Sequence, residues 1–202
     1  MLSGRYTQCC LVFLCIQFYP VIMKNAGSKL ALWEGTGALF IIIVGSLLHF
    51  TFAWSGNWYP LALVSAVNES VWEHLKLAFW PGLIWALIES RYMAVSRAYF
   101  WAVKSIALLL PTLIIPAIFY SYTSLLGTHI LIIDIASFVV AVAVAQTASF
   151  VMLKQQLRRP ILIRAGLVLG AVQVVAFACF TYFAPDHFLF IETRSGLRGI
   201  IP

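Results

Sequence analysis

Hydrophobic residues are concentrated in five long runs, which shorter polar segments separate. Each run is long enough to cross a bilayer as a helix, which requires about 20 predominantly apolar residues. Helices are the expected form because backbone groups in lipid must be hydrogen-bonded internally. The pattern therefore predicts an all-α fold, a polytopic transmembrane helix bundle with five spans that forms a single domain over residues 28–202. The runs cover residues 30–54, 71–88, 98–120, 130–153 and 161–184.

A shorter apolar stretch, residues 9–23, precedes these runs and has three interpretations. At about 15 residues it is short for a span, and Pro20 interrupts it. One interpretation treats residues 1–27 as an apolar extension added by an upstream mis-start, with Met23 as the alternative start. The second is a sixth, N-terminal span. The third is a signal peptide or anchor, against which the bulky residues that follow Pro20 argue.

The composition agrees with a membrane protein. Hydrophobic residues make up 62% and charged residues 10% of the 202 residues, whereas about a quarter of a soluble domain is charged. Such a chain cannot cover its own surface in water, so a soluble enzyme and a nucleic-acid-binding module are excluded. The lipid bilayer is the expected partner and nucleic acid is not. The sequence does not identify a protein partner or a homo-oligomer.

Basic residues occur in alternate connections between the runs, which predicts an orientation. Lysines and arginines precede the first run and lie between the second and third and between the fourth and fifth, whereas residues 55–70 and 121–129 contain none. Cytoplasmic loops carry the excess of Lys and Arg. We therefore expect a protein of the cell (inner) membrane whose core has a cytoplasmic N-terminus and an extracytoplasmic C-terminus. Lys104, inside the third run, is expected to reach the inner interface.

With this orientation, all four histidines and most of the acidic residues lie toward the outer side. The densest polar segment is 68–76, and a structural interpretation explains much of it. Ser70 and Glu73 have the spacing of a capping box at a helix N-terminus. Asn68 can cap one turn earlier. Glu73 can pair with Lys76, three residues later.

A chemical interpretation accounts for the excess of polar residues. Glu69 and Glu73 are four residues apart on one helix face, where two carboxylates need a positive partner. With His49, His74 and His129 as metal ligands, a mixed histidine and carboxylate site would suit zinc. Glu69 or Glu73 would then be the catalytic base that acts on a metal-bound water. No HExxH or HxxxH spacing is present to support this hypothesis.

Asp134 lies inside an apolar run and has no partner nearby in the sequence. Ionisable residues inside a membrane are costly and often mark ion or proton pathways. One interpretation is an interhelical hydrogen bond that holds the bundle together. The other is that Asp134 handles protons or ions.

The segment 68–77 resembles a family of small prokaryotic integral membrane proteins, a domain of unknown function that carries an NESVWEH block. Further similar pieces are residues 45–50, 54–56, 188–191, 193–196 and 199–200. The resemblance extends from about residue 30 to the C-terminus, and members of that family usually begin near Met23. It implies no established activity, substrate or cofactor. It implies a shared pattern that includes His49, Asn68, Glu69, Glu73 and His74.

Three functions therefore remain open. The first is a multi-pass integral membrane protein of unknown biochemical role, whose cluster of histidines and carboxylates at the extracytoplasmic face is structural. The second is a membrane-embedded, metal-dependent hydrolase that acts at the outer interface. The third is a small proton-coupled transporter that uses Asp134. The sequence identifies no reaction or substrate for any of them.

Overall fold

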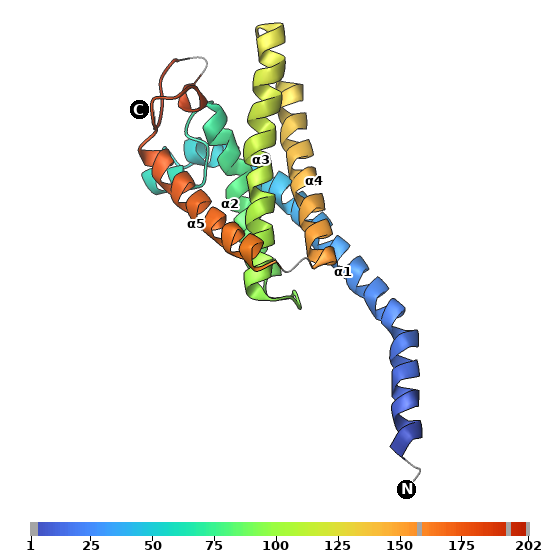
Figure 1. The fold of residues 1–202 in the computed structure, drawn as a ribbon. Helices are drawn as coiled ribbons and strands as arrows, with labels where there is room; N and C mark the ends of the chain where they lie inside the picture. Colours follow the sequence, from blue (N-terminus) through green and yellow to red (C-terminus); the bar gives the residue numbers. More distant parts are fainter. Residues whose placement is uncertain (1–3, 157–158, 193–194, 201–202) are drawn as a thin grey trace.

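The protein is described here by a computed structural model that covers residues 4–156, 159–192 and 195–200, with side chains from residue 27 onward. The described chain is helical, which confirms the predicted all-α bundle (Figure 1). Two short 3-10 helices, η1 (Tyr59–Leu63) and η2 (Phe188–Phe190), lie outside the main helices. The five α-helices are α1 (Gly4–Trp54), α2 (Val71–Glu89), α3 (Arg97–Leu126), α4 (Leu131–Gln155) and α5 (Pro160–Tyr182).

Four segments are long and apolar enough to cross a membrane, namely Gly27–Trp54 of α1 and the whole of α3, α4 and α5. Helix α2, which was predicted as the second of five spans, is not among these four, and it carries Glu73, His74 and Lys76 near its start. It packs against α1 and α3, and most of its residues are buried. Successive helices still alternate in direction through the bundle (Figure 1).

The first part of α1 extends away from the other helices (Figure 1). The side chains of residues 1–26 lie outside the described part of the chain. The three interpretations of residues 1–27, namely a mis-start before Met23, a sixth span, and a signal peptide or anchor, therefore stay predictions. The domain boundary at residue 28 also stays a prediction.

Small residues allow the helices to approach one another closely. A Cβ atom added to Gly45 of α1 would lie 2.4 Å from the Leu77 carbonyl oxygen of α2. One added to Gly166 of α5 would lie 2.8 Å from the Ala102 Cα of α3. Close packing of this kind is a principal source of helix association in lipid, where apolar side chains gain little by leaving the solvent. These two glycines therefore set the spacing of α1 against α2 and of α5 against α3.

We expect Gly166→Ala to lower the thermal stability of the bundle. The added methyl group meets backbone atoms of Ala102, and overpacking of this kind costs about 1–3 kcal/mol. Gly35→Ala is the matched control, because nothing lies within 4 Å of a Cβ atom there and alanine favours a helix by up to about 1 kcal/mol over glycine. Thermal unfolding in detergent should give a lower Tm for Gly166→Ala alone. Equal changes in both variants would contradict the close contact.

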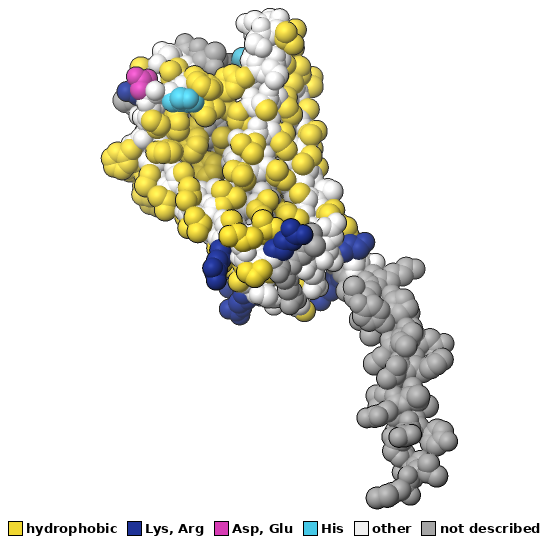
Figure 2. Space-filling view, viewed as in Figure 1, with side chains coloured by type: hydrophobic (Ala, Val, Ile, Leu, Met, Phe, Trp, Pro, Cys, Tyr) yellow, Lys and Arg dark blue, Asp and Glu magenta, His cyan; other side chains and the backbone are white. Residues whose placement is uncertain are grey.

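The two ends of the bundle differ in charge. The basic end, where α2 and α4 finish, carries a group of exposed lysines and arginines (Figure 2). We call the opposite end the histidine end, because His49, His74 and His129 lie where α1 finishes and where α2 and α4 begin. Among the described residues, the exposed lysines and arginines of the basic end are Lys29, Arg91, Arg97, Lys154, Arg159 and Arg164.

Candidate metal centre

The connection from α1 to α2 turns back onto the last turns of α1. Gly56 has a left-handed φ of 71°, which lets the chain reverse directly after Trp54. Ser65 then fastens the connection, because its Oγ accepts a hydrogen bond from the Phe52 backbone N–H at 3.0 Å and donates one to the Leu48 carbonyl. The residues that follow Ser65 are thereby held beside the end of α1.

The C-terminal tail contacts the same connection and positions Glu69. The Asn68 Nδ2 atom donates a hydrogen bond to the Gly199 carbonyl at 2.7 Å. The Glu69 backbone N–H donates to Glu192 Oε1 at 3.3 Å. Asn68 Oδ1 accepts from the Ser70 backbone N–H at 2.8 Å. Asn68 thus orders the turn before α2 and also holds the tail, whereas the N-cap of α2 is Ser70.

The predicted capping box between Ser70 and Glu73 does not form. Ser70 is the N-cap of α2, but its buried Oγ makes no hydrogen bond. Glu73 accepts from the Val67 backbone N–H at 3.0 Å and pairs with Lys76, whose Nζ lies 2.5 Å from Glu73 Oε2. The physical reason is charge, because a buried carboxylate gains more from an ammonium group than from a neutral amide. The predicted pairing of Glu73 with Lys76 is confirmed.

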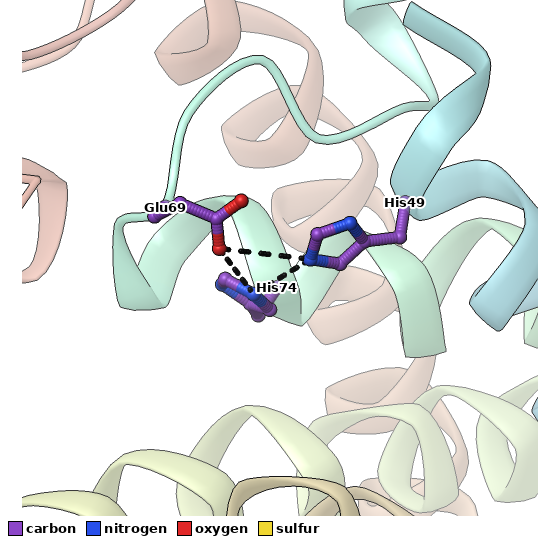
Figure 3. Close-up of side chains that lie close together, drawn as sticks. All are labelled: His49, Glu69 and His74. Atoms are coloured by element: carbon purple, nitrogen blue, oxygen red, sulfur yellow. Dashed lines mark hydrogen bonds and ion pairs between the residues drawn. The ribbon is translucent and has the colours of Figure 1, made fainter. Parts of the chain in front are cut away.

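Three potential metal ligands meet at the histidine end (Figure 3). His49 comes from the end of α1, Glu69 from the connection and His74 from the first turn of α2. His49 Nε2 lies 3.2 Å from His74 Nε2. Glu69 Oε2 lies 3.6 Å from His49 Nε2 and 3.4 Å from His74 Nε2. Among the residues that the structure describes, no other group of three or more such side chains is close enough to share an ion.

The protonation of these groups suits metal binding. His74 Nδ1 lies 2.8 Å from the Ser70 carbonyl oxygen. A carbonyl oxygen only accepts hydrogen bonds, so Nδ1 carries the proton and the lone pair of Nε2 points into the cluster. Such a bond from the second ring nitrogen to a backbone carbonyl is typical of histidines that bind metals. When the two rings are protonated instead, the hydrogen bonds that His49 and His74 donate hold the pKa of the Glu69 carboxyl well below its usual range, and a metal would displace those protons.

The spacing of the three atoms fits a tetrahedral ion. Zinc lies about 2.0–2.2 Å from histidine nitrogens and carboxylate oxygens, which places tetrahedral ligand atoms about 3.3–3.5 Å from one another. The observed separations of 3.2, 3.4 and 3.6 Å bracket that value. The exposed fractions of the side chains are 26% for His49, 35% for His74 and 49% for Glu69. A fourth coordination position would therefore face solvent.

The structure places the remaining predicted site residues elsewhere. Glu73 is 2% exposed and directed to Lys76 rather than to the cluster. His129 Nδ1 lies 3.3 Å from Asp134 Oδ2, at the start of α4. The Tyr122 hydroxyl of α3 donates a hydrogen bond to the Asp134 carboxylate. Asp134 therefore makes the interhelical hydrogen bond that one interpretation of the sequence predicted.

A comparison with protein families agrees with these features. The sequence profile of DUF6512, a family of unknown function, matches residues 22–200. The chain belongs to DUF6512. The predicted resemblance to a family of unknown function is thereby confirmed. No curated protein and no solved structure matches the chain.

The DUF6512 chain also contains a charged cluster that the sequence did not predict. Lys104 was expected to reach the inner interface, but it is 3% exposed and pairs with two carboxylates inside the bundle. Its Nζ lies 2.8 Å from Glu34 Oε1 and 2.6 Å from Glu89 Oε2. The correction has a physical reason, since an ammonium group can stay buried when carboxylates surround it. The sequence could have indicated this cluster, because Glu34, Glu89 and Lys104 each lie within or at the end of an apolar run.

Proposed function

We propose that this DUF6512 protein is a multi-pass integral membrane protein that binds one zinc-type ion through His49, Glu69 and His74. We further propose that a water on this ion carries out hydrolysis at the membrane–water boundary. The observation that carries the proposal is the convergence of two imidazole nitrogens and one carboxylate oxygen at tetrahedral spacing. The function is thus that of a membrane-embedded, metal-dependent hydrolase.

The ligand set supports a catalytic rather than a structural ion. Structural zinc sites close all four positions with protein ligands, whereas catalytic sites use three protein ligands and keep one position for water. Two histidines and one glutamate form such a set of three. A bound metal lowers the pKa of its water to about 7, which supplies a hydroxide nucleophile near neutral pH. The open side of the cluster gives this water access to a substrate.

The contacts of the two carboxylates support a different role for each in this proposal. Glu69 was a candidate base, but its carboxylate oxygen lies in the ligand triangle and thus serves as a ligand. Glu73 was the other candidate, and its pairing with buried Lys76 makes it a structural residue. In this proposal the ion itself activates the water, and Glu69 neutralises part of the ion's charge.

The charge of the two ends supports an extracytoplasmic location for the centre. Exposed lysines and arginines gather at the basic end (Figure 2), and cytoplasmic segments of membrane proteins carry the excess of these residues. The histidine end is the opposite one, so we propose that the cluster and the C-terminal tail face the extracytoplasmic side of the cell membrane. Substrates would reach the ion from that side or from the outer leaflet.

Metal analysis of the purified protein tests the proposal. After incubation with zinc and removal of free ion, we expect about one zinc per chain, because the described residues offer one group of three ligands. His49→Ala and His74→Ala should each reduce the bound zinc to background. His129→Ala is the matched control and should keep the full amount, since His129 pairs with Asp134 outside the cluster.

Equal zinc content in His74→Ala and His129→Ala would overturn the metal site. The hydrolytic part is tested separately, with ester and amide lipid analogues presented in detergent micelles. We expect turnover by the zinc-loaded chain that is lost in His74→Ala and retained in His129→Ala. Zinc binding without turnover of either class of analogue would leave a metal-binding protein and contradict the hydrolase proposal.

A further inference from the structure

A second cluster lies in the half of the bundle nearest the basic end and joins four helices. Glu34 of α1 and Glu89 of α2 both pair with Lys104 of α3. Helix α4 contributes neutral groups, because the Ser149 Oγ donates to Glu34 Oε1 at 2.6 Å and Gln146 Nε2 donates to the Glu34 carbonyl at 3.3 Å. The cluster is separate from the metal centre, which lies at the histidine end.

The cluster is sealed from solvent. Glu34 and Lys104 are each 3% exposed, and Glu89 is 0% exposed. A small cavity borders Lys104 and Gln146 and is otherwise lined by apolar side chains and glycine, including those of α2 and α4. Charges in such surroundings are costly unless they are balanced.

The formal charges of the cluster do not balance. Two carboxylates face one ammonium group, and among the described residues no other charged side chain of α1, α2, α3 or α4 contacts them. Three buried oxygens, Glu34 Oε2 and both carboxyl oxygens of Glu89, also accept no hydrogen bond, although Glu89 Oε2 forms the ion pair with Lys104. An unbalanced negative charge with free acceptor atoms is costly in a sealed site, so binding of one more positive charge is favoured there.

We propose that Glu34, Lys104 and Glu89 form a proton-binding site inside the bundle, with one exchangeable proton on the Glu89 carboxyl. Glu34 is the ionised member, because its Oε1 receives hydrogen bonds from both Lys104 and Ser149. Glu89 is the protonated member for two reasons. Among the described residues its carboxyl has one polar contact, the ion pair with Lys104, and it is the last residue of α2, where the negative end of the helix dipole opposes a carboxylate.

The position of Glu89 indicates the side from which the proton exchanges. Helix α2 ends at Glu89, and the exposed Arg91 of the basic end follows two residues later. The proton therefore has its shortest route to water at the basic end. Proton binding at this site requires neither a metal at His49, Glu69 and His74 nor hydrolysis, so the inference stands apart from the proposed function.

Infrared difference spectroscopy on the full chain with isotope-labelled glutamate tests the proposal. At neutral pH the unchanged protein should show the carbonyl band of one protonated glutamic acid, and this band should shift after exchange into deuterated water. Glu89→Gln should remove the band. Glu34→Gln should also remove it, because the remaining carboxylate and Lys104 then balance. Glu192→Gln, which changes a glutamate at the histidine end, is the control and should leave the band unchanged.

Lys104→Met provides a test with the opposite sign. Without the ammonium group both carboxyls must be neutral, so the protonated band should about double. Absence of a protonated glutamic acid in the unchanged protein at neutral pH would overturn the proposal, whatever the folding of the variants. The band should persist when sodium chloride replaces choline chloride. Its loss would mean that a sodium ion takes the place of the proton, and would overturn the proton as the occupant of the site.

Discussion

Lys76→Met is expected to unfold a large part of the protein under conditions in which the unchanged chain is folded. Lys76 is 0% exposed and is held by Glu73 Oε2 at 2.5 Å and by the Ala62 carbonyl at 2.6 Å. Removing it leaves a buried carboxylate without its cation, which costs about 3–5 kcal/mol. That is a large share of the roughly 5–15 kcal/mol by which a typical domain is stable.

The effect should be measured as the Tm and as the folded fraction in a mild detergent at neutral pH. Lys154→Met is the matched control, because Lys154 is exposed and should tolerate the change. The double variant Glu73→Gln/Lys76→Met should recover much of the loss, since it leaves no unpaired buried charge. A single variant as stable as the control would show that Glu73 does not depend on Lys76.

The sequence was sufficient to predict some of the contacts that form within one short segment. The pairing of Glu73 with Lys76 follows from a spacing of three residues on a helix, and the structure confirms it. Asn68 was proposed as a cap one turn earlier from its residue type, and in the structure it accepts the Ser70 backbone N–H just before α2 begins. The capping box failed although it is also local, because the spacing of Ser70 and Glu73 does not show that Lys76 and Val67 compete for the carboxylate.

Interactions between distant helices were harder to predict. Sequence reasoning proposed His49, His74 and His129 as one ligand set because all three lie toward the same side of the membrane. The structure brings the first two together and leaves His129 with Asp134. The three histidines do lie at one end of the bundle, but the sequence does not define the rotation of each helix about its axis, and this rotation decides which side chains meet.

The buried cluster around Lys104 shows the same limit. Glu34 and Lys104 are 70 positions apart in the sequence, and no local spacing connects them. Their shared depth could have been inferred, since each lies in the half of its helix nearest the basic end. Their contact depends on how α1 packs against α3 and α4, which apolar periodicity alone does not define in helices that are apolar on most faces.

The second large effect is expected from metal binding. At a zinc concentration about a thousandfold above Kd, a ligand that binds only the folded state stabilises it by about 4 kcal/mol. The ion should bind only the folded state, because its three ligands come from α1, from the connection after it and from α2. These segments separate on unfolding, so the unfolded chain does not hold the ligands together. Thermal unfolding with added zinc should show a higher Tm, and a chelator should reverse the shift.

Three variants separate this linkage from nonspecific effects of zinc. His74→Ala and Glu69→Gln should lose most of the zinc-dependent rise in Tm, since each removes a ligand or its charge. His129→Ala should keep the full rise, because His129 lies outside the ligand triangle. An equal zinc-dependent rise in all three would mean that the ion binds elsewhere. A rise lost in His74→Ala but kept in Glu69→Gln would mean that the two histidines bind the ion without the carboxylate, and would remove Glu69 from the proposed centre.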